Sequence, residues 1–344
     1  MRNKLFVTDC EGPLTINDNA YELSKEFIPD GDKLFEKLSN YDDILTDELK
    51  NEGYLAGTTL RYIIPFLLAY GLDNQKSREF AKKTINMVPK SDLLLKTAEK
   101  NIDSYIISTS YQQYIESLCD QMEFPVKNTF FTKIDLDSFN LSEEESDKIK
   151  ELKDIILSAN FDEIHDIFTN QIPKMSIGNQ INDIIPVGGN GKLSALKEII
   201  EKNNSNPKKV FYAGDSITDV EVLEYLKENG GVAVSFNGNE FALKSADIAI
   251  IADNSTPLLL ILDLFFRFNS DYVKQFVDGL SIDFERTIGE FKCNHEILDK
   301  FKETYKNNKL PIITRITDDN INGLINESLK SRMLIRGESI ANLG

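Results

Sequence analysis

Cysteine, histidine and clusters of basic residues are scarce in this sequence of 344 residues. The three cysteines, Cys10, Cys119 and Cys293, lie far apart, so the sequence predicts neither a disulfide framework nor a thiolate metal site. The two histidines, His165 and His295, are too few for an imidazole-based zinc or iron centre. A metal site in this chain must therefore use oxygen ligands and a hard cation such as Mg²⁺.

The sequence also lacks a hydrophobic run long enough to cross a membrane. Its most apolar stretches, 62–70 and 258–266, have about half the necessary length, and we interpret both as buried core elements. The first residues reach Asp9 too soon to form the apolar region of a signal peptide. We therefore expect a cytoplasmic protein without direct membrane insertion.

A formal net charge of −17 without any basic run argues against a nucleic-acid partner, because nucleic-acid binding depends on clustered Lys and Arg. The same charge repels small anions in general. A small anionic substrate would need a local metal ion or lysine to attract it.

Short apolar, β-rich runs alternate with helical patterns, in a chain that is 41% hydrophobic and 28% charged. This alternation predicts an α/β fold with a doubly wound, mostly parallel sheet, in which ligands bind at the carboxyl ends of the strands. The expected strands are 5–8, 104–108, 210–213, 231–236 and 247–252, and the clearest helices are 114–122, 192–202 and 220–229.

The alternation of strand and helix patterns, and the places where it stops, predict that the chain has four parts. The catalytic core comprises 1–16, 101–141 and 183–255, and 17–100 forms a helical cap. A small helical insertion covers 142–182, where Ser142 and Glu145 form a capping-box pattern. The segment 256–344 is a C-terminal helical extension without a chemical motif.

Two acidic motifs follow predicted strands. Asp9 and Glu11 come after the first strand, and Asp215 and Asp219 come after the third, one helical turn apart. Asp-x-Glu pairs are also common in solvated turns, and Asp219 also suits a helix cap. Asp9, Asp215 and a loop carbonyl can supply oxygens to Mg²⁺, with Asp219 as a further ligand or as support for the ligands.

Three other polar residues suit a phosphate group. Ser108 and Thr109 end the second strand and offer hydroxyl and N–H groups, and the alternative role of a simple N-cap is compatible with phosphate binding. Lys192 follows the run Gly188-Gly189-Asn190-Gly191 and can place an ammonium group on the same phosphate, although a lysine at a helix start usually faces solvent. A Walker motif is rejected because Leu193 replaces the required Ser or Thr.

The sequence resembles the haloacid dehalogenase superfamily, specifically its phosphatases with a helical cap. The resemblance lies in four motifs and their order along the chain: the acid pair, the hydroxyl residue, the lysine and the second acidic motif. The resemblance implies that Asp9 becomes an aspartyl phosphate and that Glu11 protonates the leaving oxygen and then activates water. It also implies that Ser108 and Lys192 hold phosphate oxygens and that Asp9, Asp215 and the Glu11 carbonyl hold Mg²⁺.

One departure concerns Glu11, because the family usually has Asp at this position. Phosphoserine phosphatase-like members have a similar Asp-x-Glu-Gly motif, which favours activity with the longer acid. The opening residues 7–15 also look like archaeal predicted phosphatases encoded beside energy-converting hydrogenase genes, sometimes labelled subunit R.

We therefore expect a magnesium-dependent phosphomonoester hydrolase that acts on a small soluble metabolite. Thr58, Thr59 and Arg61 are candidates for substrate contact from the cap, and a role in cap packing is an equal alternative. A non-catalytic subunit of a larger complex is a second hypothesis, although the chain retains all six polar positions of the resemblance: Asp9, Glu11, Ser108, Lys192, Asp215 and Asp219. Phosphoryl transfer to an acceptor other than water is a third.

Overall fold

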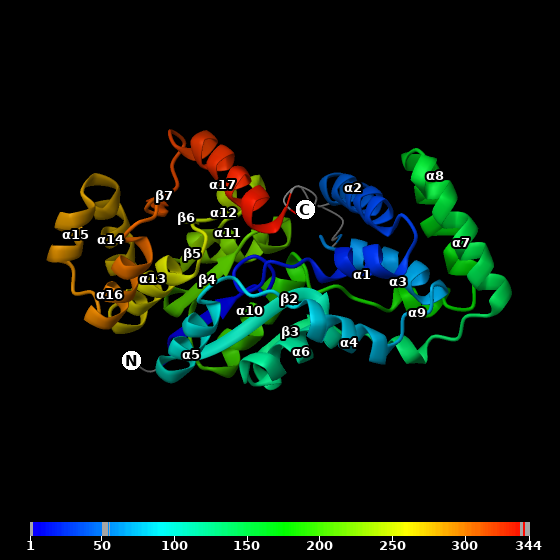
Figure 1. Cartoon of the computed structure of the whole chain (residues 1–344), viewed down its shortest axis with the longest axis horizontal. Helices are drawn as coiled ribbons and strands as arrows, with labels where there is room; N and C mark the ends of the chain where they lie inside the picture. Colours follow the sequence, from blue (N-terminus) through cyan, green and yellow to red (C-terminus); the bar gives the residue numbers. More distant parts are fainter. Residues whose placement is uncertain (1–2, 50–53, 55, 338–339, 341–344) are drawn as a thin grey trace. The chain divides into compact units, whose positions relative to one another are not determined.

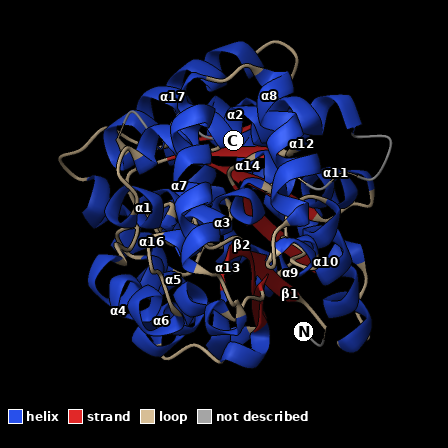
Figure 2. Ribbon diagram, turned by 90° about the vertical axis from the view of Figure 1, so that its right-hand side faces the viewer, coloured by secondary structure: helices blue, strands red, loops and turns tan. Residues whose placement is uncertain are grey.

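The computed structural model describes residues 3–49, 54, 56–337 and 340. Within these residues the strands form a seven-stranded sheet in the order β3-β2-β1-β4-β5-β6-β7. The pairs from β2 through β6 are parallel, and β7 pairs with β6 in antiparallel orientation. Figure 2 shows the strands in red and the helices in blue. The predicted α/β fold, with a mostly parallel sheet and additional helices, is confirmed.

The central strands form where short apolar runs are buried on both faces, as parallel strands require. Every residue of β1 and β4 is buried. The predicted strand positions are confirmed, and β3 and β7 are additional strands at the two edges. The strands are β1 (Leu5–Thr8), β2 (Asp103–Tyr111), β3 (Thr129–Thr132), β4 (Val210–Gly214), β5 (Val232–Phe236), β6 (Ile248–Ile251) and β7 (Ile312–Arg315).

The chain divides into two compact units. The first contains Met1–Ile16, Asn86–Ile107 and Lys192–Asn342. It holds most of the sheet, and Figure 1 shows its helices from α10 to α17 in green to red. Its helices are α5 (Ser91–Asn101), α10 (Asn190–Lys202), η6 (Pro207–Lys209), η7 (Ile217–Asp219), α11 (Val220–Glu228), α12 (Glu240–Ser245), α13 (Thr256–Arg267), α14 (Ser270–Ile282), α15 (Phe284–Glu290), α16 (His295–Tyr305) and α17 (Ile321–Arg336).

The second unit contains Asn17–Ile85 and Ser108–Gly191 and is mostly helical. The predicted capping box at Ser142 and Glu145 is confirmed at the start of α7. The helices are α1 (Asn19–Phe27), α2 (Gly31–Leu49), α3 (Thr59–Ala69), α4 (Asn74–Thr84), α6 (Gln112–Met122), η2 (Val126–Asn128), η3 (Leu136–Ser138), α7 (Glu143–Ser158), α8 (Phe161–Asp166), η4 (Ile167–Gln171), η5 (Ile172–Lys174) and α9 (Gly178–Asn182). The predicted division into core, cap, insertion and extension remains a prediction.

The two most apolar stretches are core elements, as expected. In α13 every residue from Thr256 to Phe266 is buried, which fits a helix that is hydrophobic on all sides. In α3 the residues from Tyr62 to Leu67 are buried. Among the described residues, no helix combines the length and the apolar character that spanning a bilayer requires.

Candidate active site

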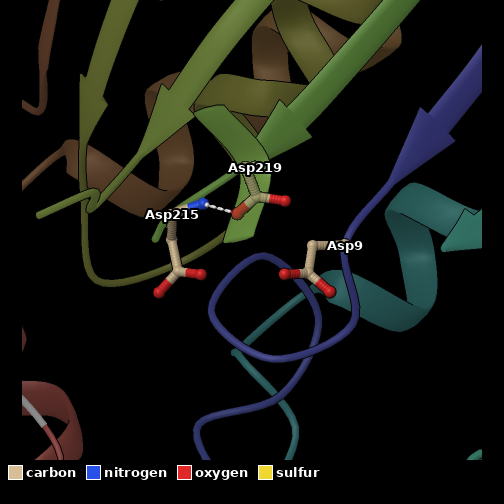
Figure 3. Close-up of side chains that lie close together, drawn as sticks. All are labelled: Asp9, Asp215 and Asp219. Carbon is tan, nitrogen blue, oxygen red and sulfur yellow. Dashed lines mark hydrogen bonds between the residues drawn. The ribbon is translucent and has the colours of Figure 1, made fainter. Parts of the chain in front are cut away.

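Three buried aspartates lie together at the carboxyl ends of β1 and β4. Asp9 follows β1 and Asp215 follows β4, and these strands are aligned with Thr8 opposite Ala213. The backbone N–H of Asp9 also donates to the Ala213 carbonyl at 2.8 Å. One ligand oxygen each of Asp9, Asp215 and Asp219 lies within 4.8 Å of the others. Figure 3 shows Asp9 after one strand, facing Asp215, on the loop after the neighbouring strand, and Asp219, which lies in η7.

Lys192 links two of these carboxylates through buried ion pairs. Its Nζ donates to Oδ2 of Asp9 at 2.5 Å and to Oδ1 of Asp219 at 2.7 Å. The lysine side chain has no exposed surface, so the expectation that a lysine at a helix start faces solvent is wrong here. The first unit therefore brings together Asp9, Lys192, Asp215 and Asp219, as the acidic motifs and the lysine predicted.

Asp219 is surrounded by hydrogen-bond donors. Its Oδ2 accepts from the backbone N–H groups of Asp215 at 2.9 Å and Ser216 at 3.0 Å, which makes it part of a capping box. Its Oδ1 accepts from Lys192 and from the hydroxyl of Tyr212 at 2.5 Å. Asp219 also occupies the N-cap position of α11, as expected, but its side chain makes no cap hydrogen bond to that helix. The contact with Tyr212 was missed, because a tyrosine inside a buried strand carries no motif signal.

The titration of Asp9 is strongly shifted by its surroundings. Burial, together with the neighbouring carboxylates of Asp219 and Asp215, raises the pKa of Asp9 to about 8 despite the opposing charge of Lys192. Burial by itself lowers the pKa of Lys192, but Asp219 and Asp9 hold it above its ordinary value. Crowded buried carboxylates of this kind are a common feature of functional sites.

The loop after Asp9 turns sharply at Gly12. Gly12 has a φ of +95°, and a Cβ atom built on it would lie 2.3 Å from Cγ of Asp215. Glycine is therefore required both by the left-handed backbone and by the closeness of the carboxylate. Glu11, on the same loop, is partly buried, and its backbone forms a bridge with Thr15.

Ser108 and Thr109 belong to the second unit and lie inside β2, which continues to Tyr111. Ser108 is fully buried, and its Oγ accepts from the backbone N–H of Ser110 at 3.1 Å. The Thr109 hydroxyl donates to the carbonyl of Val187 at 3.0 Å. Helix α6 begins at Gln112, two residues before the predicted start, and its N-cap is Tyr111, so neither hydroxyl residue is its N-cap.

One of the cap candidates of the second unit, Thr59, binds a buried carboxylate. The backbone N–H and the hydroxyl of Thr59 donate to Oδ2 of Asp42 at 2.9 and 2.8 Å. Thr58 is buried, and its carbonyl accepts from the N–H of Arg61 at 2.8 Å. The Arg61 guanidinium lies 5.5 Å from the ring centre of Tyr62. These contacts support the packing alternative for the two threonines.

Two arginines of α17 reach Asp215. Nη1 of Arg332 lies 2.7 Å and Nη1 of Arg336 lies 2.8 Å from the same carboxylate oxygen, Oδ2. Sequence reasoning missed both residues. Their spacing of four places them on one helix face, but nothing in the sequence links that face to a loop more than a hundred residues away.

The chemistry of this donor set fits a hard divalent cation. The converging groups are carboxylate oxygens, which Mg²⁺ prefers, and the absence of a Cβ atom at Gly12 lets the loop after Asp9 approach the Asp215 carboxylate closely. Among the described residues this is the one cluster of three such side chains.

The family of the chain follows from comparison with known sequences. The profile of the haloacid dehalogenase-like hydrolases matches residues 69–257, more than half of the chain, and the protein belongs to this family. The matched region includes Ser108, Lys192, Asp215 and Asp219, whereas Asp9 and Glu11 precede it.

Among solved structures, the chain is similar to a gene product of Archaeoglobus fulgidus. The two share 27% identity with a TM-score of 0.80, over 100% of this chain and 99% of that chain. It is also similar in fold to phosphoserine phosphatase. A phospho-aspartyl intermediate analogue and a substrate-bound complex of that enzyme align with TM-scores of 0.50 and identities of 15% and 14%, over 75% of this chain and 98% of theirs. No curated protein sequence matches this chain.

Proposed function

We propose that this hydrolase removes the phosphoryl group from a small phosphorylated metabolite through an aspartyl phosphate on Asp9. The observation that carries the proposal is the position of Lys192, whose ammonium group joins Asp9 to Asp219 beside Asp215 in a buried cluster. Family membership supports hydrolysis, and the fold of phosphoserine phosphatase supports a phosphate ester as substrate.

In the proposed reaction, a carboxylate oxygen of Asp9 forms a bond to phosphorus while the bond between phosphorus and the ester oxygen breaks. Glu11 gives its proton to the departing oxygen and then takes a proton from the water that hydrolyses the aspartyl phosphate. Ser108, Thr109 and Lys192 hold the phosphoryl oxygens. The products are an alcohol and inorganic phosphate, and both acids return to their starting states.

We further propose that Asp9, Asp215 and the carbonyl of Glu11 would hold Mg²⁺. When bound, this ion supplies positive charge to the phosphoryl oxygens, which is the main requirement of phosphoryl transfer. Asp219 acts as support for this set, because its two oxygens already accept from Lys192, Tyr212 and two backbone N–H groups. Arg61 is the cap residue that we propose for contact with the leaving group.

The test is phosphate release from a generic aryl phosphate and from a panel of phosphorylated metabolites. We expect release in the presence of Mg²⁺, loss of release with a chelator, and recovery when Mg²⁺ is added in excess. Alcohol and phosphate should appear in equal amounts.

Other results would point to the remaining hypotheses. An excess of alcohol over phosphate, together with a phosphorylated acceptor, would show that the protein transfers the phosphoryl group to that acceptor and not to water. No release from any ester by the folded, Mg²⁺-loaded protein would favour a subunit of a larger complex, as the resemblance to hydrogenase-linked phosphatases suggests.

Replacing Gly12 by Ala is expected to lower kcat by at least about 100-fold, because the added Cβ must displace Asp215 and a misplacement of about 1 Å costs that much. The change is measured by steady-state kinetics at saturating Mg²⁺. Gly71→Ala is the matched control, since Gly71 also has a positive φ of +79° but no atom closer than 3.7 Å to the added Cβ. Equal losses of kcat in both variants would mean that glycine is required at position 12 because of backbone strain, and not because an added Cβ atom would lie too close to Asp215.

A further inference from the structure

Helix α17 ends at the candidate active site of its own unit. Arg332 donates through Nη1 to Oδ2 of Asp215 at 2.7 Å, and Arg336 donates to the same oxygen at 2.8 Å. The exposed fraction of the side chain is 2% for Arg332 and 8% for Arg336. Two buried guanidinium groups therefore face a single carboxylate, whose charge they more than neutralise.

The docking of α17 is specific and does not depend on Asp215 alone. The hydroxyl of Ser328 donates to the carbonyl of Gly238 at 2.6 Å, and Leu324 packs with Leu243 and Ile251 in a buried cluster. Helix α17 contacts α12 and β6, and Figure 1 shows it, in red, beside α12. The helix thus has its own attachment to the sheet, which brings the arginines to the same place whether or not they are paired.

The two arginines are held differently. Arg332 also donates to the backbone carbonyls of Asp215 at 3.1 Å and Asn237 at 3.0 Å, so two of its bonds do not involve the carboxylate. Arg336 has a backbone bond from Nε to the carbonyl of Ile16 at 2.9 Å, and it lies in the last turn of α17. The side chain of Arg336 is also the more exposed of the two, so we choose Arg336 as the residue that leaves Asp215.

A small pocket lies beside these groups. Its lining includes Gly12, Asp215, Arg332 and Arg336, together with the apolar side chains of Ile16 and Ile335. Positive charge at such a place matters in a chain with a formal net charge of −17, because the overall field repels an anionic substrate.

We propose that α17 belongs to the active site. Without a metal ion, Arg336 occupies the position of a divalent cation on Asp215. Once a metal ion binds that carboxylate, both arginines pair with the anionic substrate. The inference rests on the proposed function and adds residues to it. The Arg336 guanidinium group and the metal ion compete for the same oxygen of Asp215, so the binding of one weakens the binding of the other. A phosphate dianion can then pair with the guanidinium groups in place of the Asp215 carboxylate. Binding of the metal ion therefore strengthens binding of phosphate, and the reverse also holds.

The experiment is calorimetric titration of Mg²⁺, and then of inorganic phosphate, into the full chain. We expect Arg336→Gln to bind Mg²⁺ at least about tenfold more tightly than wild type, since the competing charged hydrogen bond is gone. We expect the Mg²⁺-loaded variant to bind inorganic phosphate at least about tenfold more weakly. Lys330→Gln is the matched control, because it removes one positive charge from an exposed position of the same helix.

Arg336→Lys keeps the charge and should keep the Mg²⁺ affinity close to that of wild type, which separates charge from side-chain shape. A second readout is hydrogen exchange in the last turn of α17: Mg²⁺ alone should increase exchange, and added phosphate should reverse the increase. Unchanged Mg²⁺ affinity in Arg336→Gln, or equal changes in Lys330→Gln, would overturn the inference even if wild type hydrolyses phosphate esters. Tighter Mg²⁺ binding in Arg336→Gln without any ester hydrolysis would instead contradict the proposed function alone.

Discussion

Replacing Asp9 by Asn is expected to abolish phosphate release and, at the same time, to make the metal-free protein more stable at pH 8. The loss of kcat should be at least about 10⁴-fold, as when other enzymes lose the nucleophile of a covalent mechanism. The gain in stability has a separate cause. Asp9 is buried beside Asp219 and Asp215, and the amide removes a charge that these neighbours oppose.

The sign of the pH dependence follows from the shifted pKa. In the folded protein the pKa of Asp9 is about 8, whereas an unfolded chain has an Asp pKa of about 3.9. Between these values the folded state keeps a proton that the unfolded state releases, so the stability from this group falls as pH rises through the folded pKa. The metal-free wild type should therefore lose stability from about pH 4 to pH 8, and Asp9→Asn should lack that part of the loss.

Thermal unfolding in the presence of a chelator, measured between pH 5 and pH 8.5, checks this prediction. Asp120→Asn is the control, since Asp120 is an exposed carboxylate on α6 and should change neither activity nor the pH slope. An Asp9→Asn variant with the same pH slope as wild type would contradict the shifted pKa, and one with wild-type kcat would contradict the role of Asp9 as nucleophile.

Replacing Lys192 by Met is expected to destabilise the protein at pH 8 by about 3–5 kcal/mol and to abolish activity. Removing one member of a buried ion pair leaves the other charge uncompensated, and Lys192 is bonded to two buried carboxylates, Asp9 and Asp219. Chemical denaturation gives the stability, and phosphate release gives the activity. The stability loss should become smaller at pH 5, where the raised pKa of Asp9 leaves that group protonated.

Lys153→Met provides the matched control. Lys153 is also a buried lysine, but its Nζ contacts the carbonyl of Pro29 and the exposed carboxylate of Asp154. Its replacement should cost only about 1 kcal/mol, because no buried charge is left behind. Adding Asp9→Asn to Lys192→Met should recover part of the lost stability, and a purely additive result would show that the two side chains do not interact.

Much of the site was predictable because its acidic residues follow apolar strands. Thr8 and Ala213 end buried runs that read as parallel strands, and the carboxyl ends of neighbouring parallel strands meet at one edge of the sheet. That rule places Asp9 and Asp215 at the same edge of the sheet, and the pairing of β1 with β4 in the structure brings them together. The spacing from Asp215 to Asp219 likewise predicted a helix start near Asp219, and the structure has a capping box of Ser216 and Asp219 there, at η7.

What the sequence by itself determined, then, is the α/β fold, the positions of the central strands and the acidic residues at their ends, because these depend on local patterns and on one rule of sheet geometry. Only the tertiary structure decided that Lys192 is buried between two carboxylates, that Tyr212 bonds to Asp219, and that Arg332 and Arg336 reach Asp215. These contacts join residues whose own surroundings in the sequence carry no sign of them. The arginine contacts exist because α17 packs against β6 and α12, and such packing is a property of the whole first unit.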